Sequence, residues 1–309
     1  MFNTLLRLIK KEEGTVIVLL AVGLTVFLGF TALVTDVGLL LVKRNQFSQA
    51  MDAAALAGAQ ELPGNPAAAA QKAKEYALKN GVDPVDITVT ISPDNKQVNV
   101  KSTKQIELIF ARVLGRNVSN VGAQAKAMVA PAKSVTGAVP MSILDNITLV
   151  VGNQYIIKSA DKVGNYNNGW RDILDFTGGG GGADEYREMT LNGYQGQLTV
   201  GQVIVKENGN KSGPTEQGVN TRIASCNRIP PCSATDYEPD CPRLVWVPVV
   251  HEVDATSVQI VGFAAFYLEQ VDGNGNNNNV WATLVNQTIS AEIDPTLTGY
   301  GLYGSKLIN

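Results

Sequence analysis

Apolar residues dominate the chain from Thr15 to Val42, and Asp36 is the one charged residue in this run. The 21 residues from Thr15 to Thr35 carry no charge, and a membrane-spanning helix needs about 20 residues. Thirteen of them are Val, Ile, Leu or Phe. Together they favour insertion by about 4–8 kcal/mol, whereas one Asp at the bilayer centre costs about 3 kcal/mol. The pattern therefore predicts a transmembrane helix over residues 15–36.

This apolar run is longer than that of a secretory signal, which has about 7–15 apolar residues, so we expect an uncleaved anchor. Basic residues flank it on both sides: Arg7, Lys10 and Lys11 before it, Lys43 and Arg44 after it. The excess on the N-terminal side favours a cytoplasmic tail over residues 1–14. We expect a single-pass protein of the cell membrane, with the bulk of the chain extracytoplasmic.

Asp36 lies at the end of the predicted span, which leaves two interpretations of its carboxylate. It either reaches water at the membrane interface or binds a cation or N-terminal amine of a partner subunit. The helix is expected to continue through an alanine-rich stretch to about Leu62, because Pro63 and Gly64 follow. Such a helix is roughly 70 Å long. Ala54, Ala57 and Gly58 would let another helix approach closely.

The stretch DVGLLLVKRNQFSQAMDAAALAGA resembles the N-terminal signature of the Tad (tight adherence, Flp) pilus-assembly proteins of the TadE/TadG-like kind. The matching positions are Asp36, Gly38, Arg44, Asp52 and the block from Ala53 to Ala59. The resemblance implies a bacterial membrane protein that assembles or anchors surface pili and is not an enzyme. Its implied partners are other Tad pilus-assembly proteins or pilins, with homo- or hetero-oligomers formed through the N-terminal helix.

Two features depart from this family pattern. The Asp-x-Ser-x-Ser metal motif of the von Willebrand A domain, which many TadG-like proteins carry, is missing from the sequence. Gly14 precedes the apolar run as a leader-peptidase site would, but the fifth residue after it is Leu19 where processed members have Glu. The resemblance therefore favours an unprocessed member without a von Willebrand A domain.

Residues 37–130 are predicted to form a pilin-like α+β module. Asn65 and Pro66 open a second helix that Gly81 ends. Alternating residues predict strands over 86–92 and 96–102, joined by a turn, and a third strand over 121–130. Residues 106–115 are predicted as a short helix. The fold class is therefore α+β.

Beyond a predicted linker over residues 131–140, the helical pattern ends and residues 141–309 are predicted to form a mainly β, sandwich-like domain. Its expected strands cover residues 146–151, 154–159, 197–207, 243–253, 257–271 and 280–293. Glycine- and asparagine-rich turns separate these strands.

Composition adds few candidates for chemistry. The net charge of −3 gives no support for nucleic-acid binding. Cys226, Cys232 and Cys241 are the only cysteines, which allows one disulfide and one remaining thiol in an oxidising compartment. A zinc site is less favoured, because it needs four close ligands and His251 is the only histidine.

Three further motifs are interpreted as structural. The glycines of Thr177–Asp184 lack the Lys-Ser/Thr pair and the following helix of a phosphate-binding loop. Asp272–Asn279 opens like a calcium loop, but its twelfth position is Thr283, so a hairpin turn is favoured. His251 lacks a nucleophile motif.

No catalytic, cofactor or metal site is predicted, and the expected function is structural. The alternative is a membrane-tethered surface module whose β-domain binds glycan or peptide. A tethered hydrolase that uses His251 is a third hypothesis.

Overall fold

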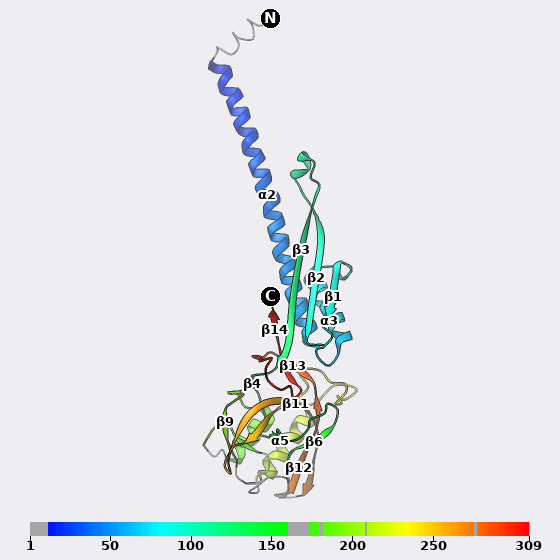
Figure 1. Cartoon of the computed structure of the whole chain (residues 1–309), viewed down its shortest axis with the longest axis vertical. Helices are drawn as coiled ribbons and strands as arrows, with labels where there is room; N and C mark the ends of the chain where they lie inside the picture. The colour runs from blue at the N-terminus through cyan, green and yellow to red at the C-terminus, as the bar shows by residue number, and fades with distance from the viewer. Residues whose placement is uncertain (1–11, 160–172, 180–181, 208, 275–276, 309) are drawn as a thin grey trace.

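The computed structural model describes residues 12–159, 173–179, 182–207, 209–274 and 277–308. A long helix extends from an elongated first sheet, and a second, rounder part lies at the opposite end of that sheet (Figure 1). Most of the predicted cytoplasmic tail, including Arg7, Lys10 and Lys11, lies outside the described residues.

Helix α2 (Glu12–Ala59) runs without interruption through the apolar stretch and beyond it. Its 48 residues give a length of about 72 Å at 1.5 Å per residue. This confirms the predicted continuous helix, which ends three residues before Leu62 because residues 60–64 form turns. The second half of α2 packs against α3 (Pro66–Lys79) and the first sheet, whereas the first half has no such cover.

Helix α3 has the predicted start. The Asn65 side chain accepts a hydrogen bond from the Ala68 backbone N–H at 3.0 Å, and Pro66 occupies the first turn. These features satisfy a free N–H and preset the backbone. Ala69, Ala73 and Ala77 recur every four residues and are fully buried, so they form the face of α3 that belongs to the core shared with α2.

The first sheet has the strand order β1-β2-β3-β14-β13. Its strands are β1 (Ile87–Ile91), β2 (Gln97–Glu107), β3 (Val118–Pro131), β14 (Leu302–Ile308) and β13 (Gln287–Ile289). The predicted β1–β2 hairpin and third strand are confirmed. A short 3-10 helix, η1 (Pro84–Asp86), precedes β1.

The prediction of a helix over residues 106–115 is wrong. Strand β2 continues to Glu107, since Ile106 and Glu107 pair with Ser119 and Val118 of β3. The helical part is reduced to η2 (Ala111–Leu114), a 3-10 turn at the tip of the β2–β3 hairpin. Cross-strand pairing therefore outweighs the local helix propensity of this segment.

The C-terminal part is mainly β, as predicted, and contains a seven-stranded sheet of order β5-β10-β11-β12-β6, in which β9 also pairs with β11 and β7 pairs with β9. Its strands are β5 (Ile143–Leu144), β6 (Gln154–Lys158), β7 (Leu174–Asp175), β9 (Val203–Lys206), β10 (Leu244–Glu252), β11 (Ser257–Asn274) and β12 (Asn277–Val285). Strands β4 (Ser134–Thr136) and β8 (Gln197–Thr199) form a separate pair. Residues 146–151, a predicted strand, are turns and coil.

Two helices in this part were not predicted, α4 (Ala183–Asn192) and α5 (Ser212–Ala224). Val219 of α5 is fully buried in the core beneath β11 and β12, so a helix covers this face of the sheet where a sandwich would place a second sheet. Helix α4 begins directly after the glycines of Thr177–Gly182. The expectation that no helix follows them is therefore wrong, and the missing Lys-Ser/Thr pair remains the argument against a phosphate loop.

The two parts are joined more closely than a linker would join them. Within the predicted linker, Ala132, Val135 and Ala138 are buried in the C-terminal core. The last strand, β14, returns to pair with β3, with Lys306 opposite Met128. Residues 131–140 are therefore packed, and the end of the predicted C-terminal domain completes the first sheet.

Candidate membrane-anchoring and assembly helix

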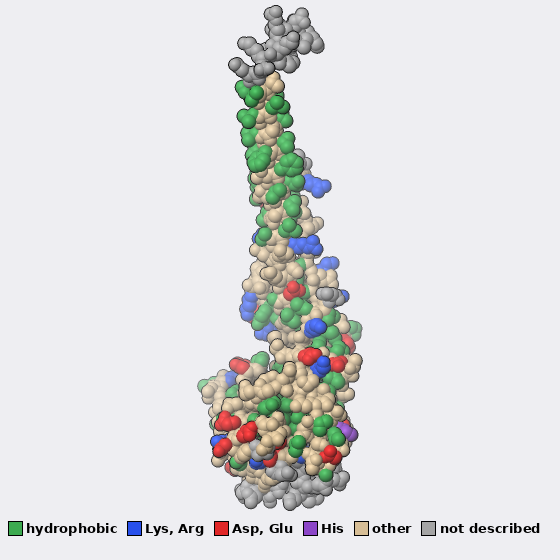
Figure 2. Space-filling model, turned by 90° about the vertical axis from the view of Figure 1, so that its left-hand side faces the viewer, with side chains coloured by type: hydrophobic (Ala, Val, Ile, Leu, Met, Phe, Trp, Pro, Cys, Tyr) green, Lys and Arg blue, Asp and Glu red, His purple; other side chains and the backbone are tan. Residues whose placement is uncertain are grey.

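The first half of α2 presents apolar side chains in every direction. Its large apolar residues between Val16 and Val34 are 52–71% exposed. Figure 2 shows them covering the whole width of the rod. This helix is long and apolar enough to cross a membrane, and none of its apolar stretch is buried by the rest of the described chain. A Cβ added at Gly23 or Gly29 would meet no atom within 4 Å.

Asp36 contacts the tip of the β2–β3 hairpin, far away in sequence. Its carboxylate accepts hydrogen bonds from the backbone N–H groups of Ile109 (2.8 Å), Phe110 (3.1 and 3.3 Å) and Ala111 (2.6 Å). Asp36 is only 4% exposed. The carboxylate thus supplies acceptors to three N–H groups at the start of η2, a place where such groups have no partner of their own.

This contact differs from both interpretations of Asp36 made from the sequence, because its partner is the backbone of the same chain. The sequence carries no local signal for this contact, because the two partners lie more than 70 residues apart. Residue Phe110, which caps η2, offers no side-chain hydrogen bond to the turn. A turn without a local capping residue needs an acceptor from elsewhere, and Asp36 is the charged residue that supplies it.

The small-residue block of α2 packs inside the chain. Ala54 and Ala57 are buried, and a Cβ added at Gly58 would lie 2.9 Å from the Ala69 carbonyl oxygen and 3.2 Å from the Ala73 Cβ. The helix that approaches these residues closely is α3 of the same chain. Helix α3 and the first sheet cover them in this chain, and contact of this block with another subunit stays a prediction.

Other positions of the signature remain accessible. Gly38 has no atom within 4 Å of an added Cβ, and Arg44 is exposed beside Ser119 and Gly122 of β3. Asp52 is half-buried. Contact of Gly38, Arg44 and Asp52 with a partner subunit stays a prediction.

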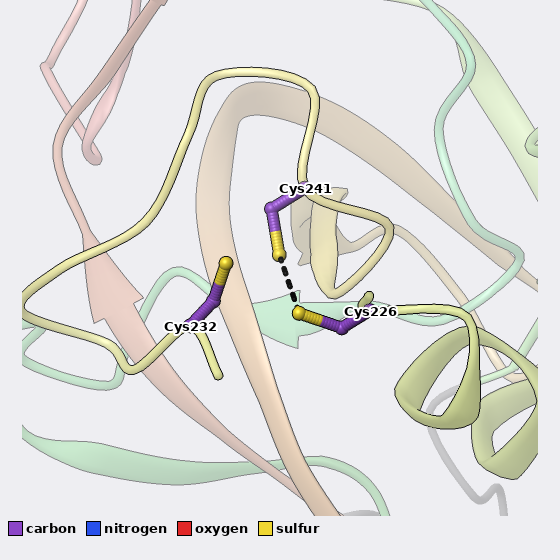
Figure 3. Close-up of side chains that lie close together, drawn as sticks. All are labelled: Cys226, Cys232 and Cys241. Atoms are coloured by element: carbon purple, nitrogen blue, oxygen red, sulfur yellow. Dashed lines mark hydrogen bonds between the residues drawn. The ribbon is translucent and has the colours of Figure 1, made fainter. Parts of the chain in front are cut away.

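The three cysteines gather in one loop region next to α5. Their sulfur atoms lie within 4.8 Å of one another, and those of Cys226 and Cys241 are 4.0 Å apart (Figure 3). All three are free thiols in the structure. The backbone N–H of Cys232 lowers the pKa of Cys226, while burial raises the pKa of Cys241 to about 12. Their proximity is compatible with the predicted disulfide, whose pairing stays a prediction.

This cluster offers three thiols for a soft metal such as zinc, one fewer than a closed structural zinc site needs. In the described ranges no fourth Cys, His, Asp or Glu joins the three. His251 is engaged elsewhere, with its Nδ1 2.9 Å from Oδ2 of Asp145 on the exposed side of β10. The donor set therefore does not complete a structural zinc site.

The calcium-like segment is part of the β11–β12 hairpin, as the favoured interpretation predicted. Asp272 accepts hydrogen bonds from Nε1 of Trp281 at 2.7 Å and from the Asn279 backbone N–H at 3.3 Å. Its carboxylate is thus committed to the hairpin. Two residues of this turn, 275 and 276, lie outside the described residues.

Residues 14–61 match the Tad family model, described as putative Flp pilus-assembly TadE/G-like. The match covers α2 from Gly14 onward and the first residues after it, which confirms the resemblance found in residues 36–59. No curated protein and no solved structure matches the chain. The N-terminal segment is thus Tad-like, of the TadE/G type, and this supports a pilus-related role.

Proposed function

We propose that the chain is a membrane-anchored structural component of Tad/Flp-type pilus assembly at the bacterial cell surface. The observation that carries the proposal is the coincidence of two features in one element. The segment that matches the pilus-assembly family, residues 14–61, consists almost entirely of α2, whose apolar half is left bare by the other described residues. A bilayer covers such a surface without any further protein.

In this proposal α2 crosses the membrane once, with the N-terminus cytoplasmic and both folded parts outside. The partners are other Tad pilus-assembly proteins or pilins. Gly38, Arg44 and Asp52 are the signature residues left accessible for them, and oligomers would form along this part of α2. The role is structural rather than enzymatic.

The test replaces the chain in a pilus-forming strain by a variant with two charges in the span, Val26→Asp with Phe27→Asp. Each Asp near the bilayer centre costs about 3 kcal/mol, so the pair offsets most of the estimated insertion free energy. We expect the protein to leave the membrane fraction and surface pili to disappear. The matched control, Val26→Ile with Phe27→Leu, keeps the span apolar and retains both.

Three results separate the alternatives. Pili that persist when the whole chain is deleted would refute the role in pilus assembly. Normal pili with lost adhesion would favour the tethered binding module. Normal pili from the doubly charged variant, with the protein in the soluble fraction, would refute the membrane anchor.

A further inference from the structure

The tip of the β2–β3 hairpin, residues 108–116, exposes apolar side chains. Ile109, Phe110 and Val113 are 57%, 44% and 88% exposed. The backbone of this tip is held by Asp36, so the exposed side chains are carried on a fixed turn. A cluster of apolar side chains on the outside of a folded turn indicates an interaction surface.

The position of the tip along α2 defines its depth relative to a bilayer. From Thr15 to Thr35 the helix rises about 31 Å, close to the roughly 30 Å thickness of the hydrocarbon core. Asp36 follows directly, so it lies at the outer boundary of that core. Since the tip backbone is within hydrogen-bond distance of Asp36, the tip lies at the same boundary.

Basic side chains surround this level. They are Arg112 and Arg116 at the tip, with Lys43 and Arg44 about 10–12 Å beyond Asp36 along α2. The acidic groups facing them are Asp36, held by the tip backbone, and Glu107, 2.6 Å from Arg112. Basic side chains therefore outnumber acidic ones, and Figure 2 shows Lys and Arg side chains gathered beside the rod.

We propose that residues 108–116 form a second membrane contact, in which the apolar side chains enter the outer leaflet and the basic side chains bind anionic phospholipid headgroups. The inference rests on the proposed crossing of the membrane by α2. Continuity with that span favours lipid as the occupant, because the tip meets α2 where the apolar surface of the helix ends. Apolar and basic side chains side by side suit an anionic lipid surface.

The contact also accounts for Asp36. A carboxylate at the edge of the hydrocarbon region needs partners that water supplies poorly there. The tip provides three N–H groups, and Asp36 in turn satisfies backbone groups that enter the interface. The carboxylate and the three N–H groups thus compensate each other for the loss of water.

The experiment uses the full chain with its three cysteines replaced by serine, reconstituted into vesicles of phosphatidylethanolamine and phosphatidylglycerol. Single cysteines carry an environment-sensitive fluorophore, introduced by Val113→Cys at the tip or Val85→Cys in η1. These valines are 88% and 85% exposed, so they are matched in type and exposure. Asp86, the neighbour of Val85, lies 3.5 Å from Lys104 on β2. Lys104 is about 10 Å before the end of β2, so the label at position 85 is set back from the tip.

We expect lipids with a nitroxide near the headgroup to quench the label at position 113 and to leave the label at position 85 unquenched. Replacing both Arg112 and Arg116 by Gln should reduce the quenching at position 113 in these vesicles. Equal, weak quenching at positions 113 and 85 would overturn the proposal. Quenching at 113 that is the same in neutral vesicles would overturn the preference for anionic lipid.

A third label, from Leu28→Cys within the span, separates this inference from the proposed function. Leu28 is 58% exposed and lies near the middle of the apolar stretch. Quenching by deep nitroxides at position 28 without quenching at 113 refutes the tip contact alone, whereas loss of both refutes the membrane crossing. A tip that is unquenched in vesicles but protected from a water-soluble quencher in pilus-forming membranes would assign a pilus protein as its occupant and refute lipid.

Discussion

Gly58 offers the sharpest test of how α2 is used, because two glycines of the same helix differ in their surroundings. A Cβ at Gly58 would lie 2.9 Å from the Ala69 carbonyl oxygen, 3.2 Å from the Ala73 Cβ and 3.3 Å from the Val98 Cγ1. A Cβ at Gly38 would meet no atom within 4 Å. The methyl group that Gly→Ala adds is therefore overpacked at Gly58 and enters open space at Gly38.

Gly58→Ala and Gly38→Ala are expected to change the stability in opposite directions. Alanine favours a helix over glycine by about 1 kcal/mol at either site. Overpacking costs about 1–3 kcal/mol, and Gly58 lies toward the upper end because the nearest atom is backbone and cannot rotate away. Gly58→Ala should thus weaken the docking of α3 by about 2 kcal/mol, which corresponds to a roughly 30-fold larger population of the locally opened state.

Hydrogen exchange of the α3 amides, measured by mass spectrometry on the full chain in detergent, checks this prediction. We expect faster exchange over residues 66–79 in Gly58→Ala and no acceleration in Gly38→Ala. If both variants exchange like the unmodified chain, α2 and α3 are not in close contact at Gly58, and the small-residue block is free to contact another subunit.

Three further predictions follow from particular contacts. Asp36→Ala should accelerate exchange of the amides of residues 109–111 by about tenfold or more because their acceptor is lost, while Asp52→Ala should not; equal rates would refute the contact. Iodoacetamide at neutral pH should modify Cys226 before Cys241, because the lowered pKa of Cys226 gives it more thiolate, and peptide mass spectrometry that finds Cys241 first would contradict this. Deleting residues 302–309 should expose the edge of β3 and raise exchange over residues 126–131 but not in β1; unchanged exchange over residues 126–131 would exclude the pairing with β14.

Elements with a local signal could be predicted from the sequence. The uncharged run after Thr15 predicts a helix long enough for a membrane, and Asn65 with Pro66 predicts the start of α3. The alternation around the Pro93–Lys96 turn predicts the β1–β2 hairpin. In each case the residues that determine the element lie within the element or next to it.

Features that depend on distant residues could not be predicted in this way. Asp36 meets residues more than 70 positions away, and β14 pairs with β3 across nearly the whole second part. Helix α5 contains Gly213, Pro214 and Gly218, which weaken its local helical signal. It forms because Val219 is buried against the sheet and Gly218 lets Thr190 of α4 approach closely.

The central claim is that α2 anchors the chain in a bilayer with both folded parts on the outer side. Alkaline carbonate extraction of membranes, combined with protease added to intact spheroplasts, tests it most directly. The account predicts that the protein stays in the membrane pellet and that external protease degrades the C-terminal part. Release into the supernatant, or a C-terminal part that only lysis makes accessible to protease, would contradict it.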